Sequence, residues 1–130
     1  MRSIEEKECM RDFILPIFLG KTARSRSLSS MLFKKLGVVS LMCDKKQSFF
    51  DGFSLCFRFC PIAAGAHSRL VLEQLLALSE KYSNHVGVLV PCTEEFSRVI
   101  DEYRGELESR FIISMPTSLL ESGPVADMMD

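Results

Sequence analysis

The stretch Gly20-Lys21-Thr22 comes closest to a chemical motif in this sequence, because Gly-Lys-Thr ends the phosphate-binding loop of many nucleotide-binding proteins. That loop needs a further glycine five residues before the Gly-Lys pair, so that backbone N–H groups can wrap a phosphate. Leu15 stands at that position, inside an apolar run. The dinucleotide fingerprint G-x-G-x-x-G fails as well, since it would need more glycines than Gly20. The sequence therefore predicts no nucleotide-wrapping loop here.

Three cations, Lys21, Arg24 and Arg26, nevertheless surround a predicted helix start. A helix N-terminus carries partial positive charge, so cations there are unfavourable unless an anion binds beside them. Two interpretations stay open. The cations are solvated surface charge, or they form an anion site in which Gly20 and Thr22 supply hydrogen-bond donors and Lys21 or Arg24 supplies the charge.

Asp44 and Cys92 each follow an apolar run. Dinucleotide-binding sheets place a ribose-binding acid where Asp44 stands, and the alternative is an aspartate that initiates a turn. Cys92 precedes a helix start, a position that lowers the pKa of a thiol, but a nucleophile there would need His67 or His85 as its base. Thr93 as a simple N-cap is the preferred interpretation.

No catalytic residue is assigned, because neither paired carboxylates nor a Ser–His–Asp arrangement stands out. Cys56, Cys60 and His67 do not have the spacing of a zinc site, and we expect no metal. The five cysteines are an odd number without the spacing of a disulfide framework, which indicates reduced thiols in the cytosol.

Apolar runs alternate with amphipathic patterns along the chain, which predicts an α/β fold with three α/β/α layers and a short, mainly parallel sheet of about four to five strands. The predicted strands are 13–19, 38–43, a weaker one around 55–59, 86–90 and 111–114. The predicted helices are 22–37, capped by Thr22 and stopped by Gly37, then 68–83, then one from Thr93 that Gly105 breaks in two, and one from 116. Pro16 suits the first residues of its strand or an edge strand.

In a parallel sheet, ligands bind at the carboxyl ends of the strands. The candidate residues for binding a substrate or anion therefore all stand at such ends or in the helix starts that follow them. They are Gly20, Lys21, Thr22, Arg24, Ser25, Arg26, Asp44, Cys92, Thr93 and Glu94.

Charge is distributed unevenly, although the net charge of the whole chain is −1. Residues 13–69 carry nine basic side chains against two acids, and residues 70–130 carry eleven acids against four bases. The first half suits an anion, but this balance disfavours nucleic acid as a partner. No apolar run approaches the ~20 residues that cross a membrane, and the charged N-terminus does not resemble a signal peptide. We expect a cytoplasmic protein.

Two stretches resemble a known family. "VLVPCTEEFSRVIDEYRGELESRFIIS" (88–114) has a strand ending in proline, a small residue, a polar residue and an acid, then a helix and a short strand. "ILPIFLGKTARSRSLSSMLFKKLGVVSLMCD" (14–44) has an apolar strand into a glycine, an Ala-Arg-Ser helix start and a Gly-Val entry to the second strand. Together they resemble the N-terminal pre-ATP-grasp domain of ATP-grasp carboxylate–amine ligases, in the branch of the D-aspartate ligase-like and carbamoyl-phosphate-synthase-like proteins.

The resemblance implies a reduced Rossmann-like domain over residues 13–120 that shapes the carboxylate side of a ligase cleft with its strand-tip loops. Residues 1–12 would be a polar lead-in and 121–130 the start of a linker. ATP and magnesium would bind in an ATP-grasp region of the same parent chain, so no cofactor and no complete active site is expected here. The implied partners are that region and a small carboxylate substrate, with a homodimer left open. The alternatives are a stand-alone Rossmann-like module for a small anionic ligand and a domain that docks a partner through its phenylalanine-rich segment, 49–59.

Overall fold

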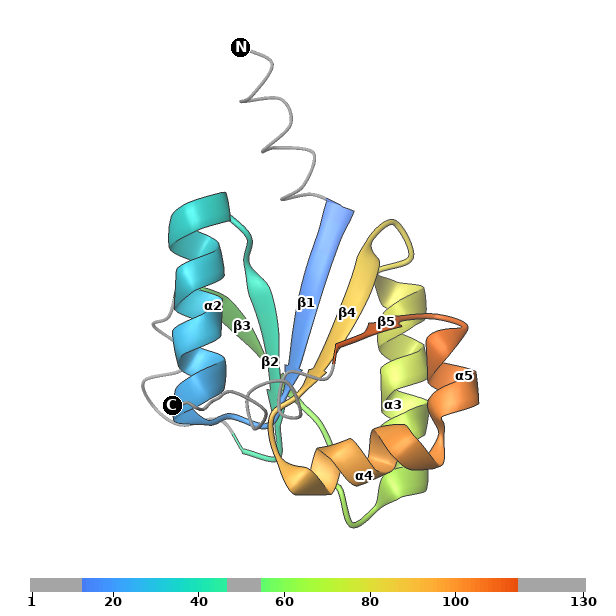
Figure 1. Ribbon diagram of the computed structural model, residues 1–130. Helices are drawn as coiled ribbons and strands as arrows, with labels where there is room; N and C mark the ends of the chain where they lie inside the picture. The colour runs from blue at the N-terminus through green and yellow to red at the C-terminus, as the bar shows by residue number, and fades with distance from the viewer. Residues whose placement is uncertain (1–12, 47–54, 115–130) are drawn as a thin grey trace.

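The computed structural model describes residues 13–46 and 55–114, which form an α/β domain around one sheet (Figure 1). The sheet contains five strands, all parallel, in the order β3-β2-β1-β4-β5. The strands are β1 (Ile14–Leu19), β2 (Ser40–Asp44), β3 (Phe57–Pro61), β4 (Val86–Pro91) and β5 (Ile112–Ile113). The helices are α2 (Ala23–Leu36), α3 (Ser68–Lys81), α4 (Glu94–Glu102) and α5 (Arg104–Glu108). The predicted fold class is confirmed.

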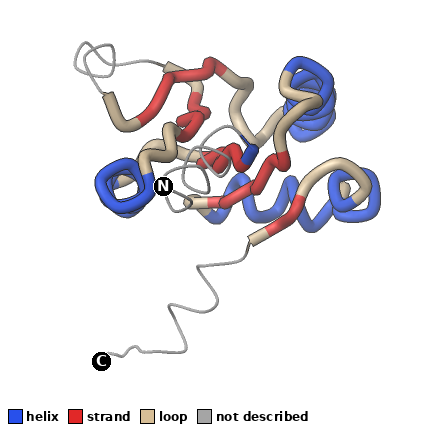
Figure 2. Tube along the Cα trace, turned by 90° about the horizontal axis from the view of Figure 1, so that it is seen from above, coloured by secondary structure: helices blue, strands red, loops and turns tan. Residues whose placement is uncertain are grey.

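Helices cover both faces of the sheet. The chain steps from β1 to β2 through α2 on one face, and it reaches β4 and β5 through α3, α4 and α5 on the other (Figure 1). Seen along the strands, α2 and α3 lie on opposite sides of the sheet (Figure 2). Parallel strands that are joined by right-handed crossovers require this arrangement when the strand order reverses direction.

The residues of β1 alternate between two apolar cores. Ile17 and Leu19 belong to the larger core, which α3, α4 and α5 complete. Phe18 belongs to the smaller core under α2, together with Met42 of β2 and Val90 of β4. Since both faces of this strand are buried, it forms a continuous apolar run rather than an alternating pattern.

Local signals set the ends of two helices as predicted. Thr22 is the N-cap of α2, and Gly37 ends that helix in the left-handed conformation at φ 69°. Thr93 is the N-cap of α4, and its side chain accepts a hydrogen bond from the Phe96 amide. The N-cap of α3 is His67, which makes no side-chain capping bond.

The predicted break at Gly105 is wrong. The interruption falls at Tyr103, between α4 and α5, and Gly105 lies inside α5. The chain changes direction between α4 and α5 (Figure 1), and Leu107 of α5 lies in the core with no exposed surface. Packing of Leu107 therefore decides the position of the break, rather than the low helix propensity of glycine.

Pro16 lies in the central strand β1, not at an edge. Its neighbour across the sheet is Val88 of β4, and pairing of β1 with β2 begins only at Ile17. The proline is therefore tolerated where β1 has one strand partner among the described residues.

Several other predicted elements have different bounds in the structure, and the strand predicted around 55–59 is Phe57–Pro61. The second strand begins at Ser40 rather than residue 38, and the helix that starts at Ser68 ends at Lys81. The lead-in 1–12, the helix from 116, the linker 121–130 and the phenylalanines Phe49, Phe50 and Phe53 lie outside the described residues. Over 13–46 and 55–114, no helix is long and apolar enough to cross a membrane.

Leu75 and Leu70 of α3 provide a test of the larger core. Leu75 has no exposed surface, whereas Leu70 is 47% exposed. We expect Leu75→Ala to lower the free energy of unfolding by about 2–5 kcal/mol, because it removes apolar contacts and leaves a cavity. Leu70→Ala should change it by less than about 1 kcal/mol. Urea unfolding followed by circular dichroism measures both, and equal losses would contradict the packing of α3.

Candidate functional site

The carboxyl ends of β1 and β4 mark the point where the strand order reverses. From β1 the chain leaves to α2 on one face, and from β4 it leaves to α4 on the other. Such a switch point forms a crevice at the edge of an open α/β sheet, and it is the usual place for a ligand. Here the first turns of α2 and α4 flank it, so two helix N-termini approach the same point from opposite faces.

Gly20 permits the close approach of the two loops at this point. Its backbone has φ +109°, a conformation that favours glycine, and its amide donates to the Cys43 carbonyl at 2.8 Å. A Cβ added to Gly20 would lie 2.6 Å from Cγ2 of Thr93. From the end of β4, the Cys92 amide donates to the Leu19 carbonyl at 2.9 Å. Position 20 therefore needs a residue without a Cβ atom. The Gly20 amide already donates a hydrogen bond within the protein, to the Cys43 carbonyl.

The Asp44 carboxylate joins the loops that follow β1 and β2. Oδ2 accepts from the Lys21 amide and Oδ1 accepts from the Lys45 amide, both at 2.7 Å. The first of these bonds links residues 23 positions apart in the sequence. The geometry favours a structural role for Asp44 over the ribose-binding role, because both carboxylate oxygens already accept backbone hydrogen bonds.

Thr22 and Ser25 satisfy each other at the start of α2. The Ser25 amide donates to Thr22 Oγ1 at 3.1 Å, and the Thr22 amide donates to Ser25 Oγ at 2.8 Å. Ser25 has no exposed surface. This reciprocal capping box stabilises the helix start, and it engages both hydroxyl groups that the sequence had suggested as ligand contacts.

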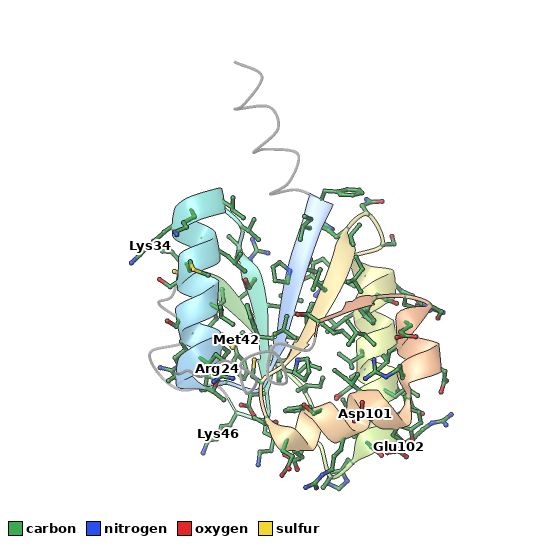
Figure 3. All side chains as sticks on the ribbon, in the orientation of Figure 1. Arg24, Lys34, Met42, Lys46, Asp101 and Glu102 are labelled. Atoms are coloured by element: carbon green, nitrogen blue, oxygen red, sulfur yellow. The ribbon has the colours of Figure 1, made fainter. Side chains whose placement is uncertain are left out.

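Arg24 and Arg26, by contrast, are exposed on the first turns of α2. Figure 3 shows Arg24 at the end of α2 that meets the strand tips, with Lys46 beyond the end of β2 and Lys34 at the far end of the helix. The Lys21 ammonium group lies 5.5 Å from the centre of the Phe59 ring and donates to the Lys46 carbonyl at 3.3 Å. The β1–β2 side of the edge is therefore strongly basic.

Cys92 lies close enough to Arg24 for the guanidinium charge to act on its thiol. Burial raises the pKa of Cys92 from 9.0 to about 11, and Arg24 offsets only part of that rise. The thiol donates to the Val90 carbonyl, with sulfur and oxygen 3.4 Å apart. The expectation that this pKa is lowered is wrong, because burial outweighs the effect of the Arg24 charge. Cys92 is thus a protonated thiol that packs against the smaller core at the end of β4.

The acids that start α4 are turned to other contacts. Glu94 pairs with Arg98 one turn further along the helix, at 3.1 Å. Glu95 accepts from the Ala66 amide at 3.1 Å, and a Cβ on Gly65 would collide with the Glu95 side chain. The sequence interpretation missed this contact between the loop before α3 and the first turn of α4. The glycine in "AAGAH" was the available signal, since a glycine often marks a close approach.

Two hollows lie at the opposite edge of the sheet, beside the amino ends of the strands. Their volumes are about 220 and 290 Å³, and both are lined by Leu15, Tyr82 and His85. In the first, Arg110 donates to Ser79 Oγ at 3.1 Å and lies 3.8 Å from Glu80, so its charge is already balanced. His85 Nδ1 has no hydrogen-bond partner within the described part of the chain. We place the candidate site at the carboxyl edge, because two helix N-termini and the basic side chains meet there.

The chain matches no model of a known protein family, no curated protein and no solved structure. The geometry itself defines the class: an α/β domain with an all-parallel, five-stranded sheet in a small, Rossmann-like, three-layer arrangement. Its switch point lies between β1 and β4.

Gly20→Ala tests the close approach at the switch point. The added Cβ meets Thr93 and imposes a strained backbone, so we expect a loss of about 1–3 kcal/mol in the free energy of unfolding. Gly105→Ala is the matched control, because a Cβ there meets nothing within 4 Å. It should stabilise α5 by up to about 1 kcal/mol. Thermal unfolding measures both, and a neutral Gly20→Ala would refute the constraint.

The raised pKa of Cys92 predicts an unusual pH profile. In the native protein, the rate of Cys92 alkylation should rise with pH with a midpoint near pH 11. In urea, the midpoint should return to 9.0, the ordinary pKa of the thiol. The pKa of Cys92 is higher in the folded than in the unfolded protein. Cys92 therefore contributes fully to the free energy of unfolding below pH 9, and this contribution is lost as the pH rises from about 9 to about 11. Mass spectrometry of the Cys92 peptide after timed iodoacetamide treatment measures the profile. A native midpoint at or below 9 would contradict the burial of this thiol.

Proposed function

We propose that the carboxyl edge of the sheet binds a small ligand through an anionic group, either a carboxylate or a phosphate. The observation that carries the proposal is the meeting of two helix N-termini, from opposite faces, at the β1–β4 switch point. Each N-terminus contributes partial positive charge, and α2 adds the guanidinium group of Arg24.

The donors for such a group differ from those that the sequence suggested. The Gly20 amide and the Thr22 hydroxyl are engaged within the protein. An α-helix leaves its first amides without partners inside the helix, and in α2 these include the amides of Ala23 and Arg24. The anion would therefore rest on the first turn of α2, with Arg24 beside it and Lys21 within the same basic region.

The finer proposal is that this edge is the substrate side of an ATP-dependent carboxylate–amine ligase. Its support is the resemblance of residues 14–44 and 88–114 to the pre-ATP-grasp domain, together with a fold of the implied class. On this proposal, ATP and magnesium bind to an ATP-grasp region of the parent chain, and the present residues position the carboxylate. The Cys92 thiol, which is protonated at neutral pH, serves as a wall and not as a nucleophile.

Loss of the two cations should weaken anion binding. We expect Lys21→Ala combined with Arg24→Ala to raise the Kd for inorganic phosphate and for a small dicarboxylate about tenfold or more, because charge-assisted hydrogen bonds contribute roughly 1.5–3 kcal/mol each. Isothermal titration calorimetry at low ionic strength measures both ligands. The matched control is Lys34→Ala with Lys35→Ala, which removes two cations from the other end of the same helix.

Surface charge without a ligand predicts a different outcome. Both double variants would then bind phosphate and the dicarboxylate with the same Kd as the wild-type protein. That result would overturn the anion site.

The ligase proposal has its own test, which separates it from a stand-alone anion-binding module. Sequencing the parent transcript beyond the codon for Asp130 should show a reading frame that continues into an ATP-grasp region. A stop codon at that point would reject the ligase and leave the anion site as it stands.

A further inference from the structure

Cys43 and Cys60 face each other across two neighbouring strands. The register of β2 and β3 places Cys43 directly opposite Cys60. Cys43 is part of the larger core and has no exposed surface, and Cys60 packs against that core while it stays half-buried. Both side chains therefore point to the face that α3 covers.

The spacing of the two residues fits a disulfide. Neighbouring strands lie about 4.8 Å apart, and the Cα atoms of a disulfide are roughly 4.4–6.8 Å apart. Among the described residues, β3 is an edge strand that pairs only with β2, so a small approach that brings the two Cβ atoms within bonding range would disturb a single strand pair. Cys56 and Cys92, in contrast, pack against the smaller core on the other face of the sheet.

The two thiols also differ in acidity, and this difference determines which of them would react first. A hydrogen bond from Cys43 lowers the pKa of Cys60 from 9.0 to about 7, although burial opposes the shift. The same hydrogen bond and burial raise the pKa of Cys43 well above 9.0. Cys60 is thus the more acidic and more accessible of the two thiols, and Cys43 is the fully buried thiol behind it.

We propose that Cys43 and Cys60 form a dithiol site whose substrates are small disulfides, such as oxidised glutathione. The Cys60 thiolate attacks one sulfur of the small disulfide, so that a mixed disulfide forms and the first small thiolate leaves. Cys43 then loses its proton to that thiolate and attacks Cys60 Sγ, which releases the second small thiolate. The second thiolate takes up the proton that Cys60 had lost to solvent. The protein gives up two electrons and two protons, and the small disulfide is reduced to two thiols.

This site goes beyond the proposed anion binding and does not depend on it. It involves β2 and β3 on the face covered by α3, whereas the basic residues and the first turn of α2 form the anion site at the β1–β4 crevice.

The test uses the intact, fully reduced protein with oxidised glutathione at neutral pH. After an acid quench, the remaining thiols are blocked and the unreduced digest is analysed by mass spectrometry. We expect a Cys43–Cys60 cross-link in the wild-type protein, a stable mixed disulfide on Cys60 in Cys43→Ala, and neither product in Cys60→Ser. Cys92→Ser should give the same cross-link as the wild-type protein.

A wild-type protein that stops at the mixed disulfide, or that forms the cross-link only after unfolding in urea, would overturn the proposal. A second measurement needs no variant: iodoacetamide at pH 7 should alkylate Cys60 at least about tenfold faster than Cys92 in the native protein. In Cys43→Ala, the midpoint of the Cys60 alkylation profile should move above 7, since its hydrogen-bond donor is gone. Equal rates for Cys60 and Cys92 would also overturn the proposal.

Discussion

The packing of β1 between two apolar cores is the constraint on which the rest of this domain depends. Ile17 and Leu19 face α3 and α4, whereas Phe18 faces α2. A central strand with both faces buried requires helices on both sides, and the right-handed crossovers then determine which helix covers which face. The reversal of direction between β1 and β4 follows from this arrangement, and it makes their carboxyl ends the switch point at which ligands usually bind.

Close packing at the end of β1 shapes that switch point. Gly20 allows the loop after β1 to approach Thr93, and Asp44 ties the same loop to β2 through the Lys21 amide. The first turn of α2 therefore begins at a crowded point, with Arg24 beside a helix end of the same sign. Without an anion, a positive charge at this helix end lowers the stability by about 0.3–1 kcal/mol. On our proposal, a bound anion makes the electrostatic interaction at this helix end favourable.

Features with a local physical cause could be predicted from the sequence. Thr22 and Thr93 cap helices because a hydroxyl oxygen reaches an amide three residues away, and Gly37 ends α2 because glycine tolerates positive φ. Features that depend on residues far apart in the chain could not be predicted in this way. The break at Tyr103 depends on the place that the core leaves for Leu107, and no local signal encodes that place.

By itself, the sequence determined the class of fold, the helix caps and the sheet edge at which strand tips and cations gather, because apolar periodicity and capping act over a few neighbouring residues. Only the tertiary structure decided that Asp44 is held by loop amides, that burial keeps Cys92 protonated beside Arg24, and that Cys43 faces Cys60. These contacts join residues far apart in the chain. They follow from the order of the strands, and that order is set by the packing of the whole domain.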